Sequence, residues 1–379
     1  MAMPILPPST LGILGGGQLG RMFVCAARSM GYEVMVLDPD PESPAGSMAT
    51  RHLHAEYTDS SALDYLVQHC AVITTEFENI PVSALDYLAQ HRPVFPSAQA
   101  LAITQNRIKE KSFIQSLGLP TPAFIALQSQ TDLAHLADMT FPAIIKTATL
   151  GYDGKGQVVC HSVDEVVSAF AEMQVDCVVE QMIDLEKELS VVLSRNEQGE
   201  AFCYPVVQNE HVNAVLDVSV APADVSEQLQ AQAVNAAQKI AYGLNYCGVL
   251  AVEFFISRSG ELLVNEIAPR PHNSGHFTLD ACYSSQFEQQ VRMICGLPSG
   301  SCELHTPVAM LNLLGDVWPQ DGEPDWSAVL RLDKSSLHLY GKKQARPGRK
   351  MGHINFLATD PLQALAHLQQ AKEILSGKG

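Results

Sequence analysis

Two glutamates inside apolar, strand-like segments constrain this chain more than any other feature. The segment VEFFI contains Glu253, SRSG is typical of a turn, and ELLVNEIA carries Glu266, so the pattern predicts a β-hairpin. An unpaired charge in such an apolar run would cost several kcal/mol, so each carboxylate needs a partner. Mg²⁺ shared with nucleotide phosphates would meet this need. Alternatively, both side chains face solvent on an edge hairpin or pair with Arg or Lys.

The tail after the hairpin, APRPHNSGH, places several polar side chains next to two prolines. Pro269 and Pro271 restrict the backbone to an extended path, which we expect to direct these side chains into one small volume. We therefore place the chemistry in residues 251–276. The polar side chains of the tail are Arg270, His272, Asn273 and His276.

Composition narrows the classes of protein to which the chain can belong. With 379 residues, 46% hydrophobic and 17% charged, it is globular and long enough for two or three domains. A net charge of −17 argues against a general nucleic-acid or membrane-surface binder. The nine cysteines lack CxxC spacing, which predicts reduced core residues and a cytoplasmic location. We find no secretory signal and no apolar run near the ~18 residues that span a bilayer.

The N-terminal segment predicts a βαβ unit. An apolar strand runs into GGGQLGRM, a helical pattern follows, and EVMVLD forms a second strand that ends at Asp38. Gly15, Gly17 and Gly20 match the GxGxxG pattern, and Asp38 lies near the distance of a ribose-binding acid, which permits an NAD site. Alternatively, the loop only turns the chain and exposes helix N-terminal amides to some polar ligand.

The next strand, CAVITTEFENIP, ends in polar residues. Glu76, Glu78 and Asn79 follow it at the carboxyl end, where ligands gather in open parallel sheets. Their position beside the Gly-rich loop predicts a substrate pocket, with surface or capping roles as the alternative.

The segment FPAIIKTATLGYDGKGQVVC predicts a phosphate-binding site. It presents a strand that ends in Lys146, a Gly-rich loop and a second strand, and a Lys with loop amides can offset phosphate charge. It is not a Walker A loop, because no GK[ST] opens a helix. Arg107, on the preceding helix, and Lys155 in the loop are either phosphate contacts or solvated charges.

Two more acids follow in the next strands. CVVEQMI is interrupted by Glu180, and Glu188 lies in the strand after it. A strand-edge backbone followed by a carboxylate can bind adenine and ribose together. A plain hairpin with acids is the alternative.

These segments together resemble the ATP-grasp superfamily and, within it, the N5-carboxyaminoimidazole ribonucleotide synthetase family of purine biosynthesis. The motifs are GGGQLGRM, TEFENIP, KTATLGYDGKGQ, EQMI, AVEFF, NEIAPRPHNSGH and RKMGHIN, in family order over nearly the full length. The implied fold is α/β (α+β). It comprises a Rossmann-like pre-ATP-grasp domain at 1–104, an ATP-grasp domain at 105–300 with a lid at about 125–190, and a small β-rich C-terminal cap at 301–379.

The resemblance also implies ligands for individual residues. Glu253 and Glu266 would hold Mg²⁺. The residues that would contact ATP are Arg107, Lys146, Gly151, Tyr152, Asp153, Gly154, Lys155, Gly156, Gln157, Glu180, Gln181, Met182, Ile183, Glu188, His211, Asn265 and Glu266.

The other two ligands would be bicarbonate and aminoimidazole ribonucleotide. The residues of the bicarbonate and acyl-phosphate pocket would be Tyr152, Lys155, Arg270, His272 and Asn273. The residues in contact with the ribonucleotide would be Gln18, Leu19 and Glu76, with its phosphate at Lys342, Arg349 and Lys350. The extra cations Lys343 and Arg346 depart from a plain pattern, so which cations hold the phosphate stays open. A solvated basic loop is the alternative.

The implied reaction combines ATP, aminoimidazole ribonucleotide and bicarbonate into ADP, phosphate and the N5-carbamate. Bicarbonate is a poor electrophile, so ATP would first convert it to carboxyphosphate, and the lid would exclude water from this intermediate. Either His272 or a phosphate oxygen would take the amine proton. A formate-dependent glycinamide ribonucleotide transformylase and an NAD-dependent oxidoreductase are the alternatives. A homodimer is usual for the resembled family.

Overall fold

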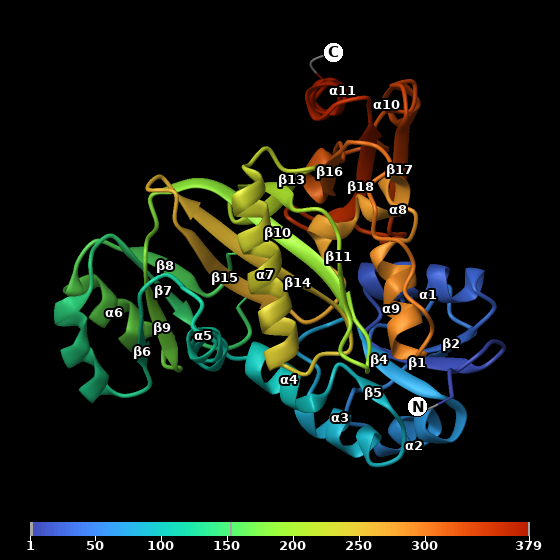
Figure 1. Ribbon diagram of the computed structural model, residues 1–379, viewed down its shortest axis with the longest axis horizontal. Coiled ribbons are helices and arrows are strands. Elements are labelled where there is room, and N and C mark those ends of the chain that lie inside the picture. The colour runs from blue at the N-terminus through green and yellow to red at the C-terminus, as the bar shows by residue number, and fades with distance from the viewer. Residues whose placement is uncertain (1–2, 152–153, 378–379) are drawn as a thin grey trace.

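Three β-sheets with helices on their faces build the protein, which a computed structural model describes for residues 3–151 and 154–377. In Figure 1 the N-terminal sheet lies at the lower right and a small sheet projects at the left. A long central sheet runs between them and continues to the C-terminal helix at the top.

The N-terminal sheet is parallel, with the order β3-β2-β1-β4-β5. It confirms the predicted βαβ unit, and β1 is buried along most of its length because helices cover both faces of such a sheet. The order reverses between β1 and β4, whose carboxyl ends therefore flank a crevice suited to ligands. The elements are β1 (Thr10–Leu14), α1 (Gln18–Ser29), β2 (Glu33–Leu37), β3 (Arg51–Leu53), α2 (Ser60–His69), β4 (Val72–Thr75), α3 (Val82–Ala89), β5 (Val94–Phe95) and α4 (Ala98–Thr104).

The central sheet has nine antiparallel strands in the order β15-β14-β10-β12-β13-β16-β18-β17, with β11 beside β10. The predicted glutamate hairpin is confirmed as β14 and β15. The C-terminal strands join this sheet through the β13–β16 pairing, and the domain boundary expected at residue 301 stays a prediction. The strands are β10 (Leu185–Arg195), β11 (Ala201–Cys203), β12 (Val207–Val212), β13 (Val215–Ala221), β14 (Gly248–Ser257), β15 (Leu262–Ala268), β16 (Val308–Leu314), β17 (Ser335–Leu339) and β18 (Lys350–Leu357).

Helices cover the central sheet and connect it to its neighbours. Ala233, Ala237 and Ile240 of α7 recur at helical spacing and pack on the core of β10 and β14. Helix α9 packs against α1 on one side and β14 on the other, which joins the N-terminal and central sheets. The remaining helices are α5 (Arg107–Ser116), α7 (Glu227–Gly243), α8 (Thr278–Ala281), α9 (Gln286–Ile294), α10 (Trp326–Val329) and α11 (Pro361–Leu375), with 3₁₀ turns η2 (Asn273–Gly275) and η3 (Gly315–Val317).

The small sheet has the antiparallel order β6-β9-β7-β8 and a hydrophobic core of its own under α6. It overlaps the lid expected at about 125–190, and its movement as a lid stays a prediction. The small core explains how this part can project from the rest of the molecule, as Figure 1 shows. Its elements are β6 (Phe124–Leu127), η1 (Gln130–Asp138), β7 (Ala143–Thr147), β8 (Gln157–Cys160), α6 (Val163–Met173) and β9 (Cys177–Gln181).

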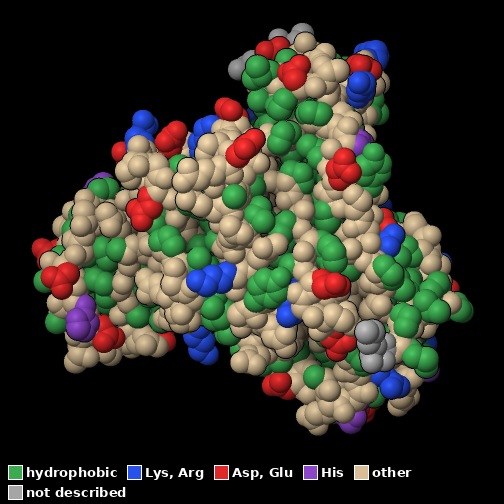
Figure 2. Space-filling view, in the orientation of Figure 1, with side chains coloured by type: hydrophobic (Ala, Val, Ile, Leu, Met, Phe, Trp, Pro, Cys, Tyr) green, Lys and Arg blue, Asp and Glu red, His purple; other side chains and the backbone are tan. Residues whose placement is uncertain are grey.

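The molecular surface mixes charged and apolar side chains. On the face in Figure 2, acidic and basic side chains lie scattered among hydrophobic ones. Within residues 3–151 and 154–377, every helix is too short or too polar to cross a membrane. All nine cysteines are free, as their spacing predicts, and six are buried. The expectation of a core position is wrong for Cys25, which is exposed, whereas Cys203 and Cys302 are partly buried.

Candidate active site

A cavity of about 300 Å³ lies where the three sheets meet. It brings together residues that are far apart in the sequence, from α5, the loop after β7, and strands β10, β12, β14, β15 and β18. Most of the predicted site residues therefore share one volume. Those that line the cavity are Arg107, Lys146, Gly151, Gly154, Gln157, Glu188, His211, Glu253, Asn265, Glu266, Arg270, His272, Asn273 and Lys350.

Other predicted site residues lie outside the lining of this cavity. Tyr152 and Asp153 fall outside the described residues, so their predicted roles stay predictions. The described residues that do not line it are Gln18, Leu19, Glu76, Lys155, Gly156, Glu180, Gln181, Met182, Ile183, Lys342 and Arg349.

The register of the hairpin places Glu253 directly opposite Glu266. Glu253 is buried, which excludes the solvent-facing alternative for that residue. Burial and the neighbouring charge of Glu266 raise the pKa of Glu253 to about 7. The pairing alternative holds in part, because Arg107 lies 3.3 Å from Glu266 and His272 Nε2 lies 3.3 Å from Glu253. Each carboxylate thus has one partner within the protein.

The two carboxylates fit one kind of metal site. In the described ranges, no group of three or more His, Cys, Asp and Glu side chains is arranged to hold a metal. Mg²⁺ at a nucleotide site needs only one or two carboxylates, because phosphates and waters complete its shell. Burial raises the pKa of Glu253 most, and the charge of Glu266 on the opposite strand raises it further, so a divalent cation between the two carboxylates would stabilise their charged forms. The donor set therefore fits a Mg²⁺ shared with phosphates.

A buried charge cluster connects the small sheet to α5. Lys146 Nζ lies 2.9 Å from Glu180 Oε2, and Lys111 Nζ lies 3.3 Å from Glu180 Oε1. Burial alone would raise the pKa of Glu180, but the two lysines lower it below its usual value. Burial in turn lowers the pKa of Lys111. The Glu180 side chain therefore anchors β9 and orients Lys146.

The backbone after Glu180 is partly engaged within the protein. The Gln181 amide donates to Ala123 O at 2.8 Å, and the Met182 amide donates to Pro142 O at 3.2 Å. These two amides are therefore occupied, so an adenine contact in this segment would use other backbone groups.

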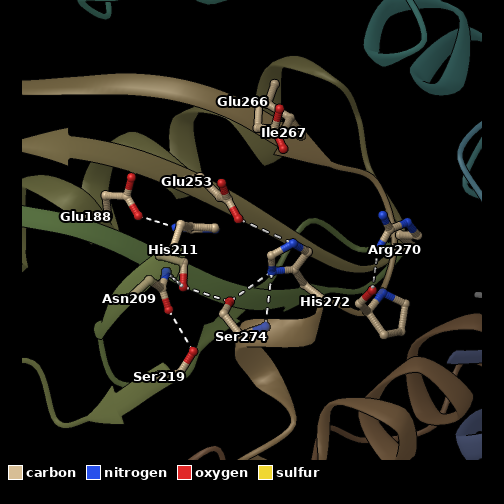
Figure 3. A network of polar contacts seen from close by, with 12 residues as sticks. Glu188, Asn209, His211, Ser219, Glu253, Glu266, Ile267, Arg270, His272 and Ser274 are labelled. Carbon is tan, nitrogen blue, oxygen red and sulfur yellow. Dashed lines mark hydrogen bonds and ion pairs between the residues drawn. The ribbon is translucent and has the colours of Figure 1, made fainter. Parts of the chain in front are cut away.

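His211 and Glu188 form a partly buried pair on neighbouring strands. His211 Nδ1 contacts Glu188 Oε2, as Figure 3 shows. Burial would lower the pKa of His211, but the bond with Glu188 and the charge of Glu253 raise it. The predicted ribose acid thus has a histidine beside it at the cavity.

The Pro-flanked tail places its first residues, Arg270 and His272, at the cavity and its last residue, His276, in the core. Arg270 pairs with Glu78. His272 lies between Glu253 and Ser274, as Figure 3 shows. Burial would lower the pKa of Arg270, but the charge of Glu78 raises it above its usual value. The expectation that His276 joins this group is wrong. The turn η2 directs His276 into the core, where its ring lies 4.6 Å from that of His353.

The N-terminal Gly-rich loop, residues 15–20, donates hydrogen bonds to two acidic side chains of the protein. Glu76 accepts hydrogen bonds from the Gly17 amide at 2.6 Å and the Gly20 amide at 2.8 Å, and Asp38 accepts one from Gly16 at 2.6 Å. A Cβ on Gly17 would lie 2.6 Å from Glu76 Oε1, so glycine is required by this close approach. Asp38 is thus bound to the loop and not presented to a ribose, which contradicts its expected role, and the amides of Gly16, Gly17 and Gly20 are occupied by the protein's own carboxylates.

Cations of the C-terminal segment fall into two groups. Lys342 Nζ donates to Gln18 Oε1 at 2.8 Å and Lys350 lines the cavity, so both lie near predicted substrate residues. Lys343 instead pairs with Glu42 at the surface. Arg349 donates to Gln344 O at 2.9 Å within its own loop.

Sequence reasoning missed Glu110 and Lys111. Glu110 lines the cavity, accepts the Ile267 amide at 2.7 Å, and has a pKa raised by burial to about 8. Together with Arg107 these residues occupy positions i, i+3 and i+4 of α5, which lie on one helix face. This spacing is the signal that could have found them.

Comparisons with known proteins match each part of the chain. The family model described as ATP-grasp domain matches residues 112–287. The ribonucleotide synthetase preATP-grasp domain matches residues 9–105, and the phosphoribosylaminoimidazole carboxylase C-terminal domain matches residues 308–367.

Curated relatives match nearly the whole chain. The N5-carboxyaminoimidazole ribonucleotide synthase of Bacillus subtilis is 42% identical over 356 residues, which cover 93% of this chain and 92% of that protein. The synthase of Brucella melitensis is 44% identical over 352 residues, which cover 92% and 96%.

Solved structures of synthetases with the same name also match the fold of this chain. The ADP complex of an N5-carboxyaminoimidazole ribonucleotide synthetase has a TM-score of 0.91, 42% identity and full coverage of both chains. The synthase of Aspergillus clavatus in complex with ADP and 5-aminoimidazole ribonucleotide has a TM-score of 0.87 and 29% identity, and the match covers 97% of this chain and 98% of that one. The NAD-dependent oxidoreductase alternative is therefore wrong. The chain belongs to the N5-carboxyaminoimidazole ribonucleotide synthase family of ATP-grasp enzymes.

Proposed function

We propose that this chain uses ATP to carboxylate the exocyclic amine of 5-aminoimidazole ribonucleotide in purine biosynthesis, with bicarbonate as the carbon donor and carboxyphosphate as the intermediate. Family membership supports an ATP-dependent ligase. One observation carries the proposal at the residue level. The opposed Glu253 and Glu266 line the same cavity as Arg270, His272 and Asn273, so the phosphoryl donor ATP and the phosphoryl acceptor bicarbonate would share one volume.

The ATP end of the cavity would be formed by the charged groups of α5, β7, β10 and β12. Lys146 is oriented by Glu180, and Arg107 lies beside Glu266 and Gly151, so both cations are placed to meet phosphate oxygens. Glu188, held by His211, would accept hydrogen bonds from a ribose. Glu253 and Glu266 would hold Mg²⁺, which would offset the charge of the phosphates.

Bicarbonate would bind at the tail. Arg270 is fixed by Glu78 and presents a buried cation to the cavity, which suits an anion that must lose its hydration. His272 and Asn273 would supply hydrogen bonds beside it. Lys155 and Tyr152 are proposed for the same pocket on the family resemblance.

The ribonucleotide would lie toward the N-terminal sheet. Gln18, Leu19 and Glu76 lie near the carboxyl end of β1. Lys342, which precedes strand β18 of the central sheet, donates a hydrogen bond to Gln18. Lys350 faces the cavity and so lies between this region and the ATP end. We propose that Lys342, Lys350 and Arg349 receive the substrate phosphate, with Lys350 as the main contact.

Water must be kept from carboxyphosphate until the amine attacks. The small sheet carries Lys146 and the second Gly-rich loop, between β7 and β8, and residues of both line the cavity. This sheet also has a separate hydrophobic core, which suits a lid that moves as one body. The nine free cysteines support a cytoplasmic location. A homodimer is proposed from the family resemblance alone.

The decisive experiment measures ADP release while the acyl donor and the acceptor are varied. We expect ADP release coupled to carbamate formation with bicarbonate and aminoimidazole ribonucleotide. ADP release that requires formate and glycinamide ribonucleotide would overturn the proposal in favour of the transformylase. Parallel titrations with Mg²⁺ and with Ca²⁺ test the metal, because Ca²⁺ prefers a larger coordination shell than two carboxylates and a nucleotide provide.

A further inference from the structure

A buried row of polar side chains crosses neighbouring strands of the central sheet to His272. Ser219 Oγ donates to Asn209 Oδ1 at 2.8 Å, Asn209 Nδ2 donates to Ser190 Oγ at 3.0 Å, and Ser190 Oγ donates to Ser274 Oγ at 2.7 Å. Ser274 Oγ lies 2.9 Å from His272 Nδ1. Figure 3 shows the row passing through Asn209 and Ser274 to the ring of His272. Its members come from β13, β12, β10 and η2.

The row has a direction, because its groups have few hydrogens. The Asn209 amide nitrogen can only donate, so Ser190 Oγ accepts from it. Ser190 has one hydroxyl hydrogen, and it goes to Ser274 Oγ. The single hydroxyl hydrogen of Ser274 is then left for His272 Nδ1. Nδ1 is therefore an acceptor.

A second observation leads to the same result independently. The backbone N–H of Ser274 points at His272 Nδ1 at 3.3 Å, and a backbone N–H can only donate. A neutral imidazole has one N–H, which must then lie on Nε2. Nε2 lies 3.3 Å from Glu253 Oε1, an oxygen that can accept this N–H.

We infer that Asn209, Ser190 and Ser274 are positioning residues that hold His272 as the Nε2–H tautomer, so that His272 acts as a hydrogen-bond donor and does not take the amine proton. The inference rests on the proposed function and chooses between alternatives that the sequence leaves open. In the carboxyl transfer, the amine nitrogen bonds to the carboxyl carbon and the bond from that carbon to the phosphate oxygen breaks. The amine proton then leaves on the released phosphate.

The row also has a purely structural explanation. Ser190, Ser274 and Ser219 are almost completely buried, and buried hydroxyls need partners wherever they occur. Under that explanation the row only fastens η2 to the sheet, and the state of the His272 ring would not matter. The experiments must therefore measure the ring or its substrate, in addition to stability.

The first experiment determines the tautomer directly in the unmodified full-length chain. Nitrogen-15 NMR of histidine-labelled protein reports which ring nitrogen carries the proton, and the signals of His272 are those lost in His272→Gln. We expect the proton on Nε2 and none on Nδ1. A proton on Nδ1 overturns the inference. The result does not depend on activity, so it is separate from a failure of the proposed function, which would appear as no bicarbonate-dependent ADP release.

The second experiment breaks the row and compares a matched variant. Ser190→Ala removes the donor to Ser274. Ser194→Ala removes a buried hydroxyl of the same strand, which donates to the Phe202 carbonyl at 3.5 Å and does not belong to the row. For Ser190→Ala we expect kcat/KM for bicarbonate to fall about 3–10-fold with KM for ATP changed less than about twofold. Ser194→Ala should leave both values unchanged.

Two results of the second experiment would overturn the inference. Equal behaviour of Ser190→Ala and Ser194→Ala would show that the row does not act on the ring. A parallel rise of KM for ATP and for bicarbonate would show that Ser190 only supports strand β10. If Ser190→Ala does not fold, the tautomer measured in the unmodified chain still decides the question.

Discussion

Glu253 and Glu266 face each other across the β14–β15 ladder, and each is held by a different segment of the chain. His272 lies against Glu253 and Arg107 lies against Glu266. The pair thus stands between the tail that would bind bicarbonate and the helix that would meet phosphates. Changes to either carboxylate should therefore affect the phosphoryl-transfer step, for which both would hold Mg²⁺.

Replacing Glu266 by Gln should abolish ADP formation and leave the fold intact. One proposed Mg²⁺ ligand is lost, and Arg107 loses its carboxylate partner. ADP release and thermal unfolding measured together test this. Glu261→Gln, in the exposed turn of the same hairpin, is the matched control. Full activity of Glu266→Gln would rule out the assignment of the metal pair.

Glu253 should make the ligand-free protein less stable as the pH rises. Its pKa is about 7 in the folded chain, above the ordinary value of 4.5, so the folded state keeps a proton that the unfolded state has lost. The stabilising contribution is complete below pH 4.5 and is lost as the pH approaches about 7, by roughly 3 kcal/mol at most. Urea unfolding across this range should show the slope in the unmodified chain and a smaller one in Glu253→Gln. Identical slopes would contradict the prediction.

Lys111→Met should lower the free energy of unfolding by about 3–5 kcal/mol, because it removes one of the two cations that hold the buried Glu180. It should also weaken ATP binding, since Glu180 orients Lys146. Lys109→Met, on the exposed face of the same helix, should change neither property. Denaturant unfolding and ATP titration measure the two effects, and equal stability of the two variants would sink the idea.

Local patterns in the sequence predicted the strands and the helix of the N-terminal unit and the glutamate hairpin. Their apolar runs and turns determine these elements from nearby residues alone. Recognition of the motifs also identified many of the residues that line the cavity, because Lys146, Glu188 and Arg270 each follow or lie in a predicted strand. The sequence did not predict how Glu76 and Asp38 fill the Gly-rich loop, since that depends on side chains from separate strands meeting in space.

Long-range packing also determines the positions of Lys111 and His276, which the sequence did not predict. Lys111 was assigned no role from the sequence, and it is buried and pairs with Glu180 from the small sheet. His276 turns away from the site because η2 reverses the chain directly after Asn273. Neither contact leaves a periodic or compositional signal nearby, although the i, i+3, i+4 charges of α5 are a partial one.

Lys350→Ala should raise KM for the ribonucleotide by at least about 10-fold while KM for ATP changes little, because its charge would meet the substrate phosphate. Arg349→Ala should have a smaller effect in the same direction, since Arg349 bonds to its own loop. Lys343→Ala, which loses a surface pair with Glu42, is the control. Equal increases in both KM values would place Lys350 at the nucleotide.

Removing His272 should separate ATP binding from carboxyl transfer. The proposed ATP contacts come mostly from α5 and strands β7 to β12, with Asn265 and Glu266 on β15, so His272→Ala should keep ATP affinity. Loss of one well-placed orienting group typically costs 10²–10⁴-fold in rate, and carbamate formation should fall by about that factor.

The measurement is parallel: ADP release and carbamate formation, with and without aminoimidazole ribonucleotide, in His272→Ala and in the exposed control His305→Ala. We expect ADP release to exceed carbamate formation in His272→Ala, because carboxyphosphate that is poorly held is hydrolysed before the amine attacks. Collapse of ATP affinity with unchanged coupling would instead mean that bicarbonate binds elsewhere. The tail from Pro269 to Asn273 would then serve only to brace the hairpin.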